Sequence, residues 1–282
     1  MLLITRAFFA AGLSAAALVC STAQGVEPSS QTSADAPVAL GAGFVDTLET
    51  FSEDWYVSDF DQKRESVQTG WRPSQVHHTP PAAPGEAGTI RLTLVPAADT
   101  DAVTEKPYIG AGLQLPGPYH YGRYEVVMQA ARGAGVVSSF FTYTGPWYGD
   151  PHDEIDFEFL GQDTTKVWVT RFADGERLPG KWIDLGYDAA GEPRLYAFEW
   201  HPGRIVWYAG ETEIFRVEAS ERTLPVTPGK LIINIWIGNE QQVGWLGRAE
   251  ENTRAEAVYR CLSFRSFEDD GPQCSDRFGS GS

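Results

Sequence analysis

The chain has 282 residues and is poor in positive charge, in cysteine and in long apolar runs. Its 22 Lys and Arg stand against 38 Asp and Glu, which gives a formal net charge of −16 at pH 7. Because so acidic a protein repels nucleic-acid phosphates and anionic lipid headgroups, neither is expected as a partner. The sequence also lacks a phosphate loop, a Cys-x-x-Cys pair, a His-Glu-x-x-His zinc motif and a Gly-x-Ser-x-Gly elbow. These absences argue against nucleotide, redox, zinc and serine-hydrolase chemistry.

One apolar run stands out, Ala7–Cys20, which follows Arg6 and is too short to span a bilayer as a helix. Ser21-Thr22-Ala23 then fits the small-x-small rule for signal cleavage. We therefore expect residues 1–23 to be a signal peptide, the protein to be secreted, and no membrane association after cleavage. Cys20 leaves lipid attachment open as an alternative, although Val19 is a poor residue to precede a lipidated cysteine.

Cleavage after Ala23 leaves two cysteines, Cys261 and Cys274. An even number in an oxidising compartment predicts a disulfide, with two free thiols as the alternative. Residues 24–43 and 271–282 are rich in small and polar residues without periodicity, so we expect a flexible leader and a flexible C-terminal tail. Residues 44–270 are then one folded domain, expected to be a monomer.

Short β-type runs, separated by Gly, Pro, Asn and Asp, fill that domain. Their spacing predicts an antiparallel sandwich or barrel, an all-β fold. His201-Pro202-Gly203 is a hairpin signal between two of them. The predicted strands are Ile90–Val95, Tyr124–Ala130, Val136–Thr144, Glu154–Leu160, Lys166–Phe172, Leu195–Trp200, Arg204–Tyr208, Glu213–Val217, Lys230–Ile237 and Val258–Phe267.

Alternation along two of these strands assigns their faces, because side chains on a strand point to opposite sides with a period of two. Ile155, Phe157 and Phe159 share an apolar face, and His152, Glu154, Asp156 and Glu158 share the opposite one. In the same way Leu231, Ile233, Ile235 and Ile237 oppose Ile232, Asn234 and Trp236.

The row Glu154, Asp156 and Glu158 is costly for a surface strand. Two carboxylates ~5.5 Å apart at an effective dielectric of ~20 repel by about 3 kcal/mol. Such a row could be a solvated acidic face or a Ca²⁺ site. A carboxyl pair that cleaves a glycosidic bond accounts for the row better, because that chemistry requires one carboxyl group to be neutral while another is ionised. One geometric condition applies. The Cα atoms of Glu154 and Glu158 are ~13 Å apart on an extended strand, so the side chains must converge to the ~5.5 Å of a retaining pair.

The segment Gly135–Thr170, with its unbroken Glu-x-Asp-x-Glu motif, resembles glycoside hydrolase family 16. Within the family it is similar to bacterial endo-β-1,3-1,4-glucanases (licheninases) and exopolysaccharide-cleaving glycanases, over roughly residues 44–267. The resemblance implies a curved two-sheet antiparallel jelly-roll sandwich, concanavalin A-like, with a carbohydrate cleft on its concave face. It further implies retention of configuration, with Glu154 as nucleophile, Glu158 as acid/base and Asp156 as the residue that orients and tunes them.

Other candidates for substrate binding are residues for which the alternation along a strand and the resemblance to the family agree on a position in the cleft. Packing in the core is the alternative for each, and for His152, which stands where licheninases often have Trp, a spectator role is the alternative. The candidates are Phe141, Tyr143, His152, Trp168, Thr170, Phe172, Asn234 and Trp236.

Two segments depart from the licheninase pattern. Gly112–Leu115 replaces a charged sugar-gripping segment of the family, and Asp61–Gln68 lacks its Asn-Gly loop. We therefore predict a retaining endo-β-glucanase acting on β-1,3-1,4-glucan or on a related β-glucan or exopolysaccharide. A transglycosylase on the same polymers and a non-catalytic lectin-like module are the alternatives. No cofactor or catalytic metal is expected, and a structural calcium ion is left open.

Overall fold

The computed structural model describes residues 39–220 and 223–279, so the predicted signal peptide and most of the predicted leader lie outside the described residues. The described residues belong to one compact unit that begins at Ala39. Within these ranges nearly all regular structure is β-strand, and no helix is long and apolar enough to cross a membrane. The helical pieces are η1 (Pro73–Gln75), η2 (Ala97–Asp99), η3 (Pro146–Tyr148), η4 (Glu240–Gln242), α1 (Val243–Leu246) and α2 (Cys274–Phe278).

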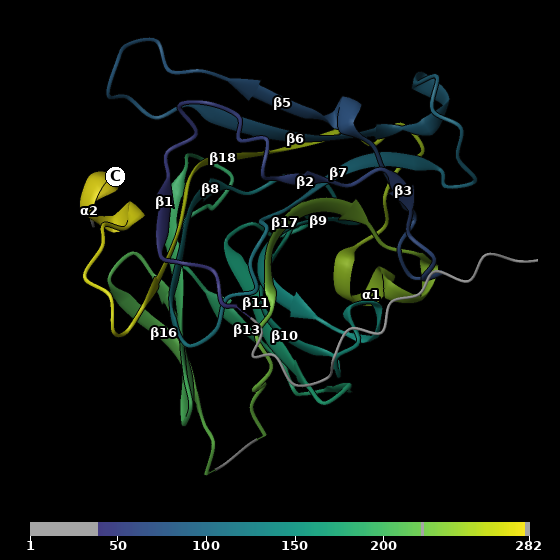
Figure 1. The fold of residues 1–282 in the computed structure, drawn as a ribbon. Helices are drawn as coiled ribbons and strands as arrows, with labels where there is room; N and C mark the ends of the chain where they lie inside the picture. Colours follow the sequence, from purple (N-terminus) through teal and green to yellow (C-terminus); the bar gives the residue numbers. More distant parts are fainter. Residues whose placement is uncertain (1–38, 221–222, 280–282) are drawn as a thin grey trace, which may run out of the picture. The chain divides into compact units, whose positions relative to one another are not determined.

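One antiparallel sheet, here called the front sheet, carries the predicted acidic strand (Figure 1). A short strand, β12 (Glu176–Arg177), also pairs with the end of β11 (Lys166–Ala173). From edge to edge the order is β2 (Tyr56–Val57), β7 (Tyr108–Gln114), β17 (Lys230–Ile237), β9 (Val136–Thr144), β10 (Asp153–Leu160), β11 (Lys166–Ala173) and β13 (Lys181–Asp184).

A second antiparallel sheet, the rear sheet, packs against the inner face of the first. Strand β1 (Phe44–Asp46) pairs with β18 (Ala255–Ser266), on the same edge of that strand as β6 (Thr89–Pro96). Strands β3 (Phe60–Asp61) and β4 (Thr69–Trp71) extend from the β7 edge of the front sheet. The rear order is β5 (Val76–Thr79), β6 (Thr89–Pro96), β18 (Ala255–Ser266), β8 (Gly122–Gln129), β14 (Arg194–His201), β15 (Arg204–Ala209) and β16 (Thr212–Glu218).

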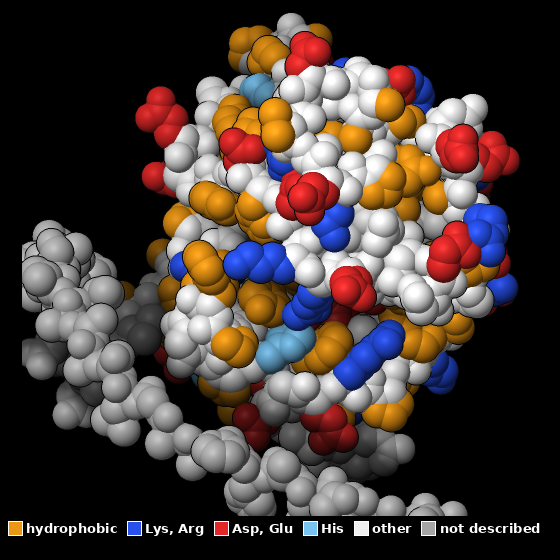
Figure 2. Space-filling model, turned by 90° about the vertical axis from the view of Figure 1, so that its right-hand side faces the viewer, with side chains coloured by type: hydrophobic (Ala, Val, Ile, Leu, Met, Phe, Trp, Pro, Cys, Tyr) orange, Lys and Arg blue, Asp and Glu red, His pale blue; other side chains and the backbone are white. Residues whose placement is uncertain are grey.

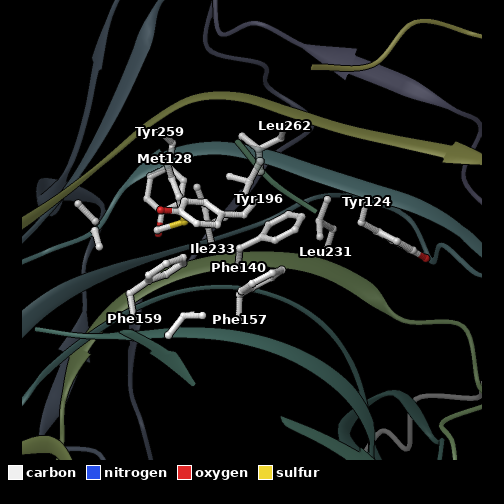
Figure 3. Packing of buried hydrophobic residues seen from close by; sticks show 14 of the residues in the cluster. Tyr124, Met128, Phe140, Phe157, Phe159, Tyr196, Leu231, Ile233, Tyr259 and Leu262 are labelled. Carbon is white, nitrogen blue, oxygen red and sulfur yellow. The ribbon is translucent and has the colours of Figure 1, made fainter. Parts of the chain in front are cut away.

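The core lies between the sheets and is built from their apolar faces (Figure 3). Phe140, Phe157 and Phe159 come from the front sheet, and Tyr196 of the rear sheet meets the last two at ring-centroid distances of 5.8 and 4.7 Å. Burying these rings holds β10 to the core through one face and leaves its acidic face outward. The all-β jelly-roll prediction is confirmed.

The predicted strands are also recovered, and two of them, Val136–Thr144 and Lys230–Ile237, coincide with β9 and β17. Strand β7 is absent from the predicted set, because Gly110 and Gly112 weaken its β pattern. Its first glycine is required by packing, since a Cβ on Gly110 would lie 2.6 Å from the carbonyl oxygen of Ile235 on β17.

The chain end differs from the predicted flexible tail. Residues Cys274–Phe278 form α2, and Cys274 is fully buried and disulfide-bonded to Cys261 on β18. The predicted disulfide is therefore present, and it holds the helix against the rear sheet. At the other end, Gly41 of the predicted leader donates a backbone hydrogen bond to Pro118 (2.7 Å).

Removing this disulfide by the double change Cys261→Ala and Cys274→Ala should lower the free energy of unfolding by about 3 kcal/mol, the value for a short closed loop. The two residues are 13 apart in sequence. Urea denaturation of the variant and of the oxidised and reduced wild type measures the effect. Equal midpoints for all three would contradict a stabilising role.

Candidate active site

Strand β10 presents the three acids on the outward face of the front sheet. Glu154 and Glu158 are half-buried, whereas Asp156 between them is only 3% exposed. Ile155, on the inward side, is fully buried, as are the phenylalanines that follow it. The alternation that the sequence predicted for this strand is thus the observed one.

Cross-strand pairing places most of the predicted substrate-binding residues beside the acids. Residues directly opposite on neighbouring strands point to the same face. Glu154 is paired with Tyr143 and Phe172 and Asp156 with Phe141 and Thr170, while Glu158 is paired with Ser139 and Trp168. We call this outward surface of the front sheet the acid face.

Thr170, Asn234 and Trp236 lie on the acid face but are largely buried. Thr170 donates to the carbonyl of Leu178 (3.2 Å), and the Asn234 amide oxygen accepts a hydrogen bond from Ser139. Trp236, 9% exposed, packs in an apolar cluster with Trp71 and other side chains. These residues therefore shape the floor of the site, and little of the Trp236 ring is available for stacking.

His152 contacts the predicted nucleophile directly. Its Nε2 meets Glu154 Oε2 in a hydrogen bond, and because a carboxylate only accepts, Nε2 carries the proton there. The imidazole stacks on Phe172 (centroids 4.3 Å apart, planes at 18°) and meets Tyr143 edge-on at 5.2 Å. This packing fixes the ring, so His152 orients one oxygen of Glu154.

The acids carry strongly altered pKa values. Burial raises the pKa of Glu158 to about 8, with the charge of Glu154 adding to the rise. Burial also raises the pKa of Asp156 well above its usual range, reinforced by the charges of Glu154 and Glu158 and by a side-chain hydrogen bond with Glu154. At neutral pH Glu158 is thus predominantly protonated, and the same effects favour the protonated form of Asp156, which can donate to Glu154.

One cationic residue near the acids was not singled out from the sequence. Arg177 on β12 lowers the pKa values of Asp156 and Glu158, against the effects of burial. Its guanidinium lies 5.7 Å from the ring centroid of Trp245. Only the hairpin-like return after β11 brings Arg177 here, and nothing in its own sequence signals that position.

Buried groups behind the acid face hold β10 in place. The indole Nε1 of Trp207, on rear-sheet strand β15, donates to the carbonyl of Asp156 (3.1 Å). Asp153 accepts backbone hydrogen bonds from Asp174 (2.7 Å), Val226 (2.8 Å) and Thr227 (2.8 Å), and so ties two loops to the start of β10. Both contacts act on the backbone from which the catalytic candidates project.

Replacing Trp207 by Phe should lower the free energy of unfolding by about 1–3 kcal/mol, because the buried carbonyl of Asp156 loses its donor. The same change should lower kcat on substrate, since β10 loses support at its middle acid. Trp55→Phe is the matched control, as it removes an indole hydrogen bond to Asp46, which is not on β10 (3.2 Å). If both variants lose stability and neither loses kcat, the support from Trp207 is structural alone.

In the described part of the chain, no group of three or more His, Cys, Asp or Glu side chains is arranged to hold a metal ion. The acid face carries a neutral acid, Glu158, and an accepting carboxylate, Glu154, on the same strand. That pair is the equipment for acid-assisted nucleophilic substitution.

Comparison with known proteins agrees with this chemistry. Residues 71–255 match the family described as glycosyl hydrolases family 16. The chain belongs to that family. Family 16 membership makes it a glycosidase, and Glu154, Asp156 and Glu158 all fall within the matched residues.

Named proteins are similar to this chain over most of its length. A beta-glucanase of Bacillus subtilis is 38% identical over 221 residues, 76% of this chain and 82% of that protein. A beta-glucanase of Acetivibrio thermocellus is 36% identical over 82% of this chain, and this chain spans 65% of its length. Among solved structures, a prokaryotic beta-1,3-1,4-glucanase (lichenase) derived from a mouse hindgut metagenome superposes with a TM-score of 0.72 at 32% identity, over 80% of this chain and 100% of that one.

Proposed function

We propose that this protein is an exported, monomeric endo-β-glucanase that hydrolyses β-1,3-1,4-glucan or a related β-glucan by double displacement. The observation that carries the proposal is the row of Glu154, Asp156 and Glu158 on one outward face of β10, where burial and the charge of Glu154 raise the pKa of Glu158 to about 8. It supplies a proton donor at neutral pH next to a carboxylate that can attack. Relatives that bear the name beta-glucanase support the polymer class, and the sequence of residues 1–23 supports export.

In the first step, Glu154 attacks the anomeric carbon while Glu158 protonates the glycosidic oxygen of the leaving chain. Asp156 and His152 each donate a hydrogen bond to Glu154 and so fix the direction of its oxygens. The bond from the sugar to the leaving oxygen breaks, and a glycosyl ester on Glu154 remains.

The second step uses the change of charge produced by the first. The negative charge of Glu154 is one cause of the raised pKa of Glu158, and esterification removes that charge. The pKa of Glu158 therefore falls in the intermediate, where the group, now a carboxylate, must act as a base. It takes a proton from water, which attacks the anomeric carbon and releases the sugar with its original configuration.

A substrate panel tests the assignment. Purified protein is incubated with barley β-glucan, lichenan, laminarin, xyloglucan and an acidic exopolysaccharide, and products are sized by chromatography. We expect oligosaccharides of several lengths from the mixed-linkage glucans from the first minutes, the pattern of internal cleavage. Release of single sugars from chain ends alone, or cleavage of none of these polymers, would overturn the proposal.

A further inference from the structure

The hairpin of β11 and β12 brings a cation to the acid face. Asp174 and Gly175, with φ of 51° and 82°, form its two-residue turn. Arg177 is then paired with Phe172, which is itself paired with Glu154. Because directly paired residues point to the same side of a sheet, the Arg177 side chain projects to the side of the acids.

The Arg177 guanidinium reaches along the acid face toward Glu158. It lies 5.7 Å from the ring centroid of Trp245, and that ring is 6.1 Å from the ring of Trp168, the residue paired with Glu158. Its charge acts on the carboxyl groups of both Asp156 and Glu158, which agrees with a position beside the second half of the row.

Backbone hydrogen bonds hold the hairpin in this place. The N–H of Gly175 donates to the carbonyl of His152 (2.9 Å), immediately before β10. The N–H of Leu178 donates to the carbonyl of Arg171 on β11 (3.0 Å). The backbone on both sides of Arg177 is therefore tied to the strands that carry the acids and their neighbours.

Arg177 also lacks the acidic partner that surface arginines of this protein usually have. Acidic and basic side chains are interspersed over the surface in Figure 2, so an exposed arginine does not by itself mark a site. Arg216, for example, is paired with Glu213 (2.6 Å). Within residues 39–220 and 223–279, the guanidinium of Arg177 forms no ion pair or hydrogen bond. Its charge is therefore available to the acids of the site.

The proposed mechanism moves one negative charge along β10. Before the first step the charge is on Glu154 and the proton is on Glu158. When the ester bond to Glu154 forms and the bond to the leaving oxygen breaks, the proton passes from Glu158 to that oxygen. The negative charge is then on Glu158, until a proton from water restores the starting state. A fixed cation beside these groups offsets a single negative charge in both states.

We propose that Arg177 is a positioning residue whose charge stabilises the carboxylate of Glu158 in the glycosyl-enzyme, so that Glu158 can act as the base toward water. This inference rests on the proposed function. Burial and the charge of Glu154 raise the pKa of Glu158, and Arg177 lowers it. Esterification removes the charge of Glu154, which leaves Arg177 to oppose the cost of a half-buried carboxylate.

Other charged and titratable groups face the acids, and the test has to separate Arg177 from them. Arg177 is the cation among the described residues whose charge lowers the pKa of Glu158. The other groups include Glu154 and Asp156 on the same strand, His152 before it, Tyr143 and Lys230 on β9 and β17, Lys166 and Asp184 on β11 and β13, and Arg64, whose charge acts on Tyr143.

The test measures the second step by itself. Arg177→Gln removes the charge, and Arg177→Lys keeps it. An aryl β-glycoside with a good leaving group makes the first step fast, so the rate after the burst reports hydrolysis of the glycosyl-enzyme. We expect Arg177→Gln to slow this hydrolysis roughly tenfold at neutral pH, and the mass of the intact protein should show accumulated glycosyl-enzyme. Arg177→Lys should stay within about threefold of the wild type.

The pH profile gives a second signature that loss of structure would not produce. Removing the cation favours the protonated form of Glu158, so in Arg177→Gln the alkaline limb of kcat/KM on β-glucan should move upward by about one pH unit. At neutral pH kcat/KM should stay within about twofold of the wild type, because the first step uses the protonated form.

Arg260→Gln is the matched control, because its guanidinium also lies against an aromatic ring, that of Phe278 at 5.6 Å, but on rear-sheet strand β18. It should change neither the second step nor the pH profile. An unmoved alkaline limb in Arg177→Gln, an undiminished second step, or a loss that Arg177→Lys shares would overturn the role of Arg177 and leave the proposed function intact. If the wild type cleaves no β-glucan, the proposed function fails and the role of Arg177 fails with it.

Discussion

Replacing Glu154 by Gln is expected to lower kcat on β-glucan by about 10⁴-fold or more, because the amide cannot form the glycosyl ester on which double displacement depends. The change is nearly isosteric and preserves a hydrogen-bond acceptor for His152. Binding of oligosaccharides should therefore survive, which calorimetry can measure. Glu256→Gln is the control, since Glu256 forms an exposed ion pair with Arg91 on the rear sheet (3.6 Å).

A smaller variant at the same position sharpens the test of mechanism. With Glu154→Gly, added azide should restore turnover, because the small anion can enter the space that the carboxylate vacated. The product should be a glycosyl azide of inverted configuration, since azide attacks from the same side as Glu154. Undiminished hydrolysis in Glu154→Gln, or no azide product with Glu154→Gly, would show that another group is the nucleophile.

Replacing Glu158 by Gln should have the second-largest effect, a loss of about 10²- to 10⁴-fold in kcat on β-glucan. The loss arises because no acid remains to protonate the leaving chain. An aryl glycoside with a good leaving group needs no such proton, so its rate of glycosyl-enzyme formation should change far less. Burst kinetics with the aryl substrate separate this step from hydrolysis of the intermediate.

The pH profile of the wild-type enzyme tests the same role of Glu158 as the acid. Because burial and the charge of Glu154 raise the pKa of Glu158 to about 8, the group is protonated below that pH and loses its proton above it. We therefore expect kcat/KM on β-glucan to fall as pH rises through about 8. Glu158→Gln should abolish this alkaline limb. A wild-type profile that falls already near pH 5 would contradict the assignment of Glu158 as acid.

The sequence predicted the parts of the site that lie on one strand. Alternation alone placed Glu154, Asp156 and Glu158 on a common face, since the core face of Ile155 leaves no other choice. It also predicted β9 and β17, whose β patterns are continuous. These features depend only on local sequence, which is why they could be read without coordinates.

The residues that the sequence did not connect with the site all act on β10 from other strands and loops. Trp207 supports Asp156 from the rear sheet, and Arg177 reaches the acids from β12. Thr170 and Trp236 have the right parity, but loop and cluster packing bury them. The cross-strand row that runs from Asp156 to Tyr56 needs the register of several strand pairs, and register is set by tertiary packing, which a single strand's pattern does not contain.

The measurement that tests the central claim most directly is the configuration of the first product, followed by proton NMR during hydrolysis of a mixed-linkage glucan. If Glu154 and Glu158 act together as a double-displacement pair, the β-anomer of the new reducing end appears first and the α-anomer grows in only by mutarotation. An α-anomer that appears first would mean a single displacement by water, and it would contradict the roles assigned to both glutamates.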